Sequence, residues 1–200
     1  MIQNKKTLIN MLENFAKSLV KTVPKWIKSC EILNNELMIT IYPEAVVPMC
    51  YFLRQNSLTR CAQLLDITAV DYPDREKRFT VVYNLLSLDW NTRVRLKTEV
   101  DELTSLESVT GVYSCAAWWE REVWDMFGIF FTEHPDLRRI LTDYGFQGHP
   151  LRKDFPLTGY TEVRYDSTEK RVVSEPLELT QEFRHFDFTS PWETIQKDPK

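Results

Sequence analysis

The four cysteines of this 200-residue chain lie far apart, and no C-x-x-C pair occurs. Structural zinc sites and iron–sulfur clusters are built from closely spaced cysteine or histidine ligands. This spacing therefore argues against a metal or cluster held by the chain itself. Widely spaced cysteines in a chain of this length are typical of free thiols in a reducing compartment. We expect free thiols at Cys30, Cys50, Cys61 and Cys115.

Other features that the sequence lacks argue against further classes of function. No apolar run approaches the about 20 residues needed to cross a bilayer, so any association with a membrane is expected to go through a partner. The net charge of −4 provides no basic field for phosphates, which argues against nucleic acid as a partner. Glycine is scarce, with five in the whole chain. Neither the G-x-G-x-x-G nor the G-x-x-x-x-G-K-[ST] pattern of nucleotide-binding loops occurs.

The first 30 residues are basic, with six lysines and a single acid, Glu13. Mitochondrial transit peptides are usually rich in arginine, whereas the first arginine of this chain is Arg54. Four apolar side chains recur at helical spacing, which predicts an amphipathic helix docked on the domain. They are Leu8, Leu12, Phe15 and Leu19.

Alternating apolar residues and turn residues predict the elements that follow. We expect strands at 27–33 and 36–42 and a helix from Pro43 to about Gln55. Three further strands are expected at about 61–70, 78–88 and 92–98, and then a helix at about 115–127 that ends at Gly128. The order helix, two strands, helix, three strands, helix predicts an α+β fold, a two-layer domain over residues 1–131.

Residues 132–200 are predicted to form a long extended C-terminal tail that clasps a partner. Six prolines interrupt the segment, but its many aromatic side chains argue against disorder. Ordering a chain costs about 1–2 kcal/mol per residue, so this tail needs a large surface that another chain supplies. The predicted partner interface consists of Trp118, Tyr144, Phe146, Arg152, Lys153, Phe155, Tyr160, Tyr165, Phe183, Phe186, Phe188 and Trp192.

The helix at 115–127 has two different faces. Helical spacing places Ala116, Trp119, Val123, Met126 and Phe127 toward the core, and places Trp118, Arg121 and Asp125 on the opposite side, which is typical of an interface. Glu120 and Glu122 lie between the two faces. Because negative charge is disfavoured near a helix C-terminus, Glu122 and Asp125 are expected to be held by cations. The expected donors are Arg121, Arg138 and Arg139.

The sequence gives little support for a catalytic or metal-binding site. Glu120 and Glu122 are two residues apart, and such residues do not face each other on a helix, so they do not form an acid–base pair. His134 and His149 are each followed by proline and have no ligand-spaced partner. We expect these histidines to hydrogen-bond to nearby backbone, and we predict no catalytic, cofactor-binding or metal-binding residue.

Two consecutive stretches, EREVWDMFGIFFTEHPDLRRIL (120–141) and TDYGFQGHPLRKDFPLTGYTEVRYD (142–166), closely resemble the thirty-kilodalton-type subunit of respiratory complex I, the proton-pumping NADH:ubiquinone oxidoreductase. The segments DYPDREKRFTVVYNLLSL (71–88) and RVVSEPLELTQEFRHFDFTSPWE (171–193) are similar to the same family. The family motif maps onto Glu120, Arg121, Glu122, Asp125, His134, Arg138 and Arg139, which the resemblance implies form a structural network.

The resemblance implies a subunit of the hydrophilic arm with no redox centre of its own, FMN and iron–sulfur clusters being held by neighbouring subunits. It further implies that the C-terminal extension clasps the forty-nine-kilodalton-type subunit near the quinone module. The implied location is the matrix side of the mitochondrial inner membrane. Two alternatives stay open: an equivalent subunit of a plastoquinone-reducing or hydrogenase-type relative, and a free-standing carboxylate enzyme.

Overall fold

The structure is a computed structural model that describes residues 2–34, 36–186, 188 and 192, with side chains described from Leu12 onward. The predicted contact of Leu8 therefore lies outside the described side chains. Two compact units are present, residues 1–157 and residues 158–200.

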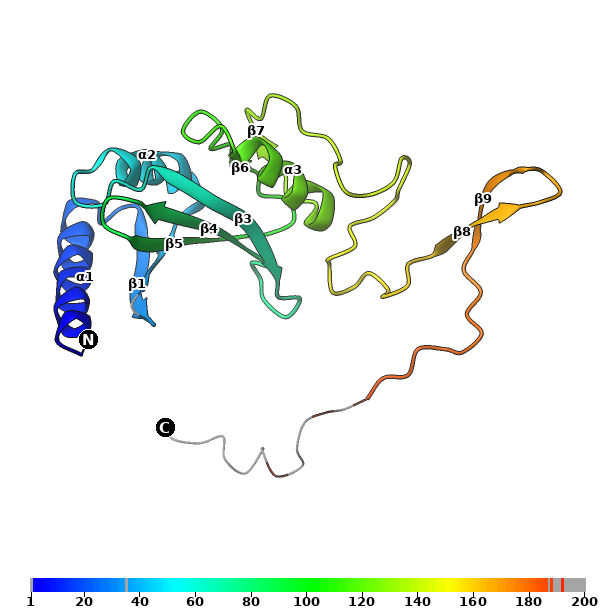
Figure 1. Cartoon of the computed structure of the whole chain (residues 1–200), viewed down its shortest axis with the longest axis horizontal. Coiled ribbons are helices and arrows are strands. Elements are labelled where there is room, and N and C mark those ends of the chain that lie inside the picture. Colours follow the sequence, from blue (N-terminus) through cyan, green and yellow to red (C-terminus); the bar gives the residue numbers. More distant parts are fainter. Residues whose placement is uncertain (1, 35, 187, 189–191, 193–200) are drawn as a thin grey trace. The chain divides into compact units, whose positions relative to one another are not determined.

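A five-stranded sheet forms the centre of the first unit (Figure 1). Its strands are β1 (Ile27–Leu33), β2 (Glu36–Ile41), β3 (Gln63–Asp71), β4 (Phe79–Ser87) and β5 (Thr92–Val100), in the order β1-β2-β5-β4-β3. All neighbouring pairs are antiparallel except β2 and β5, which are parallel. The five strands confirm the sequence prediction, with bounds that differ by at most two residues.

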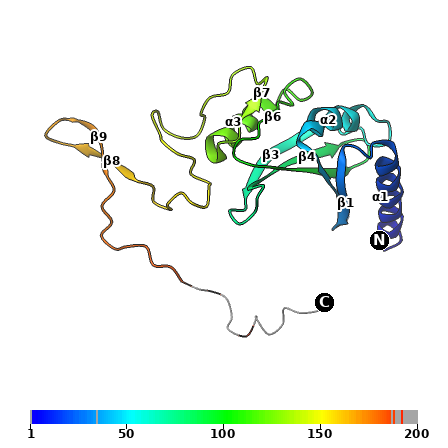
Figure 2. The ribbon, with the colours of Figure 1, turned by 180° about the vertical axis from the view of Figure 1, so that it is seen from behind.

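One face of the sheet is buried beneath helices. The register aligns Ile39, Leu96, Tyr83 and Ile67 across β2, β5, β4 and β3, and each of these side chains is buried. The helical elements are α1 (Ile2–Thr22), the short 3-10 helix η1 (Pro43–Ala45), α2 (Val46–Gln55) and α3 (Ala116–Phe127). Figure 2, seen from behind, again shows α2 and α3 over one side of the sheet, with α1 beside β1. This arrangement is the predicted two-layer α+β domain.

The other face carries a row of polar side chains that crosses four strands. Arg95 donates from Nε to Asn84 Oδ1 at 2.9 Å and pairs with Glu36 at 3.4 Å. Asn84 in turn donates from Nδ2 to Asp66 Oδ1 at 3.0 Å. Antiparallel sheets commonly present such a polar face opposite the core.

The first unit extends further than the sequence suggested. The tail was expected to begin at residue 132, whereas the compact unit continues to Leu157. Two short strands, β6 (Leu106–Glu107) and β7 (Phe131–Thr132), pair in parallel beside α3. Residues 133–157 have no helix or strand, but side chains of the preceding elements hold their backbone.

The second unit contains a hairpin that sequence reasoning missed. Strands β8 (Thr161–Asp166) and β9 (Arg171–Pro176) pair antiparallel. Asp166 closes the turn by accepting a hydrogen bond from Thr168 N at 2.8 Å, and Arg164 and Glu175 form a cross-strand ion pair at 2.6 Å. Residues 177–186 continue without helix or strand, in keeping with an extended tail. In the described part of the chain, none of the helices is both long and apolar enough to traverse a bilayer.

Candidate functional site

The carboxylate of Asp125 organises the segment that follows α3. Its Oδ2 accepts hydrogen bonds from three successive backbone N–H groups, those of Ile140 (3.1 Å), Leu141 (2.8 Å) and Thr142 (2.9 Å). Its Oδ1 accepts from Thr142 Oγ1 at 2.7 Å and from Arg139 Nη1 at 2.9 Å. Burial alone would raise the pKa of this carboxyl, but the hydrogen bonds outweigh burial and lower the pKa to about 2. Asp125 is therefore a fixed anion that holds residues 139–142 against the helix.

This geometry corrects part of the prediction for α3. Trp118 is exposed, as expected of an outward-facing residue, but Asp125 is fully buried because residues 139–142 cover its side of the helix. Arg139 is the predicted cation for Asp125. The expectation that Arg121 also binds a carboxylate is wrong, since its guanidinium donates to the backbone carbonyls of Arg138 (3.1 Å) and Arg139 (3.0 Å).

The remaining charged residues of the motif are less buried. Arg138 was expected to hold Glu122 or Asp125, but it pairs with Asp136 at 2.9 Å on the exposed surface. Glu122 is half-buried, and among the described residues it forms no ion pair, contrary to the expectation that a cation holds it.

The C-terminal end of α3 is capped by residues 149–152. The carbonyl of Asp125 accepts from His149 Nδ1 at 3.0 Å, that of Met126 from Leu151 N at 3.1 Å, and that of Phe127 from Arg152 Nε at 2.6 Å. These carbonyls are among the four that a helix leaves without a partner at its end. Gly128 adopts the left-handed conformation predicted for it, with φ of 77°. A Cβ there would lie 2.6 Å from both His149 Nε2 and Arg152 Nη2.

Glu120 is a fully buried acid in the middle of α3. Its Oε1 accepts from Val109 N at 2.8 Å and its Oε2 from Ser108 Oγ at 2.6 Å, so the helix is joined to the strand-like segment before it. Burial raises the pKa of Glu120 to about 7, although these two hydrogen bonds act in the opposite direction. His134 Nε2 lies 3.8 Å from Oε2 of Glu120.

The ring of His134 is fixed by backbone at both nitrogens. Nδ1 accepts the N–H of Asp136 at 3.0 Å, which leaves the proton of the neutral ring on Nε2, 3.0 Å from the carbonyl of Ala117. His134 and His149, each followed by proline, therefore have the same structural role, because each ring contacts a backbone carbonyl of α3. The expected bond to nearby backbone is present at His134, through Asp136, whereas His149 binds the carbonyl of Asp125, which is 24 residues away in the sequence.

A second ionic cluster was not found by sequence reasoning. Arg78 binds buried Asp71 through two bonds of 2.7 and 2.9 Å, and also reaches Glu102 at 2.5 Å and Asp154 at 3.1 Å. The hydrogen bond from Arg78 lowers the pKa of Asp71. Asp71 also accepts the backbone N–H of Lys153 at 2.7 Å, so the cluster fixes residues 152–154 to the sheet. The available signal in the sequence was a pair of opposite charges, Asp71 and Arg78, at the two ends of the connection between the strands predicted at about 61–70 and 78–88.

Several residues predicted to face a partner make contacts inside the chain. Phe146 and Phe155 lie with ring centroids 5.8 Å apart, and Arg152 caps α3. The rest of the predicted interface is exposed within its own unit: Trp118, Tyr144, Lys153, Tyr160, Tyr165, Phe183, Phe186, Phe188 and Trp192. Their contact with another chain stays a prediction.

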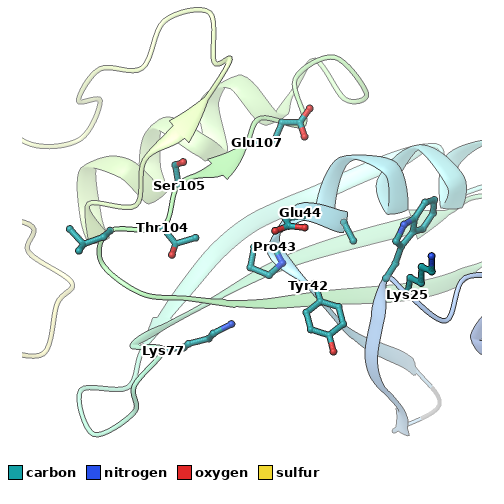
Figure 3. Close-up of a pocket in the computed structure, with 11 residues that line it drawn as sticks. Lys25, Tyr42, Pro43, Glu44, Lys77, Thr104, Ser105 and Glu107 are labelled. Carbon is teal, nitrogen blue, oxygen red and sulfur yellow. The ribbon is translucent and has the colours of Figure 1, made fainter.

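A cavity of about 940 Å³ lies near η1, and its lining does not converge on a reactive group. Figure 3 shows Lys25, Glu44, Lys77 and Glu107 at its wall, together with the hydroxyl groups of Tyr42, Thr104 and Ser105. Among the described residues, no histidine or cysteine lines it. A hydroxyl nucleophile needs a neighbouring base, and the lining residues offer no hydroxyl–imidazole pair.

The cysteines are free, as expected. Cys50 and Cys61 are fully buried, and burial raises the pKa of the Cys61 thiol to about 12. Within the described ranges, no three histidine, cysteine, aspartate or glutamate side chains are grouped so as to hold a metal ion.

The buried polar side chains of Glu120, Asp125 and His134 thus hold segments of the chain together. This pattern is found in structural subunits as well as in enzymes. Residues 39–161, more than half of the chain, match the sequence model of the respiratory-chain NADH dehydrogenase 30 kDa subunit. The chain therefore belongs to this family of complex I subunits, and the resemblance drawn from its motifs is confirmed.

Similar proteins support the same assignment. The chain is 62% identical over 188 residues to the NADH-ubiquinone oxidoreductase subunit 9 of Prototheca wickerhamii, covering 94% of this chain and 98% of that protein. It is 60% identical over 183 residues to the NADH dehydrogenase [ubiquinone] iron-sulfur protein 3 of Marchantia polymorpha, covering 92% and 94%. The subunit 9 protein of Reclinomonas americana is 55% identical over 185 residues, covering 92% and 91%.

Proposed function

We propose that this chain is a structural and assembly subunit of the hydrophilic arm of NADH:ubiquinone oxidoreductase. In this proposal it binds the forty-nine-kilodalton-type subunit near the quinone module through its C-terminal segment. It carries no redox centre and is not catalytic alone, and electrons pass through FMN and iron–sulfur clusters of neighbouring subunits. It lies on the matrix side of the mitochondrial inner membrane, where it reaches the membrane through the complex.

One observation supports this proposal most directly: the motif residues that look reactive are engaged in holding the backbone. Asp125 binds residues 139–142, Glu120 binds Ser108 and Val109, and His134 binds Ala117 and Asp136. A general acid or base must reach a substrate proton, and both carboxylates are fully buried. This arrangement argues against the alternative of a free-standing carboxylate enzyme.

The tail supports the choice of a protein partner. Its hairpin and the segment after it leave large apolar side chains exposed, among them Val163, Tyr165, Val172, Phe183 and Phe186. An isolated two-stranded hairpin is marginally stable in water. Aromatic side chains exposed on such a segment are typical of interface anchors. The relatives' names specify ubiquinone, which favours a ubiquinone-reducing complex over the plastoquinone-reducing alternative.

Truncation after Leu157 tests the proposal, because this cut removes the second unit and keeps the whole first unit. The truncated chain should melt cooperatively, fail to join the complex on native gels, and leave membranes with reduced NADH–quinone activity. The full chain with Cys30 replaced by serine serves as the control and should assemble normally. Normal complex levels without residues 158–200 would contradict the proposed role of the tail.

A second measurement addresses the redox centre. The gently purified full chain should contain iron, zinc and flavin at far below one equivalent. Iron or flavin near one equivalent would contradict that part of the proposal without affecting assembly.

A further inference from the structure

The turn at residues 143–146 presents Tyr144 to solvent with a relative exposure of 103%. The carbonyl of Asp143 accepts the N–H of Phe146 at 3.1 Å, and the Asp143 carboxylate accepts the N–H of Tyr144 at 2.8 Å. Gly145 adopts a left-handed conformation with φ of 72°. The tyrosine thus occupies a defined turn whose backbone geometry is set locally.

The segment before the turn is braced by the Asp125 carboxylate. Its bonds to Ile140, Leu141 and Thr142 end one residue before the turn begins. Five hydrogen bonds converge on this one buried carboxylate. The stem of the turn is therefore fixed to α3.

The segment after the turn is braced by aromatic packing. The Arg139 guanidinium lies 5.8 Å from the centroid of the Phe146 ring, and the centroid of the Phe155 ring is also 5.8 Å from it. Gly148 has φ of 92°, and a Cβ there would lie 2.9 Å from the Phe155 ring. Both ends of the turn are therefore held, and only its tip faces outward.

The interactions that hold the stem of the turn in place are explained if the exposed aromatic residue at its tip binds another molecule. Binding normally costs the entropy of ordering loops and side chains, and a preformed loop avoids most of that cost. Tyrosine is enriched among the residues that dominate interfaces, because its ring is apolar and its hydroxyl finds a hydrogen-bond partner. Leu141 beside the turn is also exposed, at 62%.

We infer that Tyr144 is a preformed anchor that inserts into a pocket on a neighbouring protein subunit. The pocket has apolar walls, a hydrogen-bond partner for the phenol, and a neutral or basic rim, because exposed Asp143 lies directly beside the anchor. An anionic lipid surface would be repelled by this carboxylate. The inference rests on the proposed function and adds a contact in the first unit that is independent of residues 158–200.

Substitutions in the full chain test the anchor. Tyr144→Ala should leave the melting temperature of the purified chain unchanged, because the side chain touches solvent. In membranes with limiting amounts of the chain, it should reduce incorporation into the complex at least about tenfold. Tyr144→Phe keeps the ring and should restore most of the incorporation. The matched control is Tyr51→Ala on α2, where the tyrosine is 59% exposed, and it should assemble normally.

The outcomes separate this inference from the proposed function. If the unaltered chain is absent from the complex, the proposed function fails and the anchor fails with it. If the unaltered chain assembles and Tyr144→Ala assembles equally, only the anchor is refuted. An equal defect in Tyr51→Ala, a lowered melting temperature of Tyr144→Ala, or self-association of the purified chain that Tyr144→Ala abolishes would each overturn the assignment to a neighbouring subunit.

Discussion

Replacing Glu120 by glutamine should remove a pH dependence of stability that the buried acid creates. Burial raises the pKa of Glu120 from 4.5 to about 7 in the folded chain. A raised folded-state pKa gives stability that is fully present below the unfolded pKa and is lost as pH rises through the folded pKa. The contribution of Glu120 should therefore decline between about pH 4.5 and 7.

The size of the effect follows from the shift. Each pKa unit is worth about 1.36 kcal/mol, so a shift of about 2.5 units, the difference between about 7 and 4.5, corresponds to at most about 3 kcal/mol. Glutamine stays neutral at every pH, its oxygen accepts the N–H of Val109, and its amide donates to Ser108 Oγ. The variant should match the original chain near pH 4.5 and exceed its free energy of unfolding by up to about 3 kcal/mol at pH 8.

The assay is denaturant unfolding of the purified full chain and of Glu120→Gln between pH 4.5 and 8.5. The difference between the two curves reports Glu120 together with its interaction with neighbouring groups, because groups that do not interact with Glu120 cancel. The titratable groups that face it are His134, 3.8 Å away, and Cys50 and Tyr83, whose pKa values burial raises far above this range. Parallel curves, or a variant less stable at pH 8, would refute the reasoning.

Periodicity predicted the elements that bury an apolar face against the sheet. The apolar residues Phe79, Val81, Tyr83 and Leu85 occur at every second position, which predicted β4. All four side chains are buried on one face. Gly128 gave the end of α3, because glycine adopts the left-handed conformation that terminates a helix without strain. These features depend on local rules, so one sequence was enough to find them.

The site could be predicted only in part. The helical spacing of residues shows which side of α3 faces the sheet, but it does not show which later segment packs on the opposite side. Asp125 was placed on the outer side of α3, and residues 139–142 cover that side. Glu120 was placed between the faces, and Ser108 and Val109 cover it. An irregular segment held by hydrogen bonds to side chains has no period, which is why the first unit extends to Leu157 beyond its predicted end.

Two further substitutions test the capping and bracing of α3. Gly128→Ala should lower the free energy of unfolding by about 1–3 kcal/mol, since its Cβ meets His149 and Arg152 at 2.6 Å; Gly111→Ala, where a Cβ has open space, is the control and should be near neutral in the same denaturant assay. Asp125→Asn should cost more, about 2–4 kcal/mol, because an amide can accept through only one atom and would turn an N–H toward donors of residues 139–142. The sign of its pH dependence is opposite to that of Glu120. A lowered folded-state pKa gives stability that is present above the unfolded pKa of 3.8 and lost as pH falls through about 2. The deficit of Asp125→Asn should therefore stay constant from pH 5 to 8 and shrink in stronger acid. A deficit that grows between pH 5 and 8, or none at pH 7, would show that the carboxylate does not hold this segment as a fixed anion.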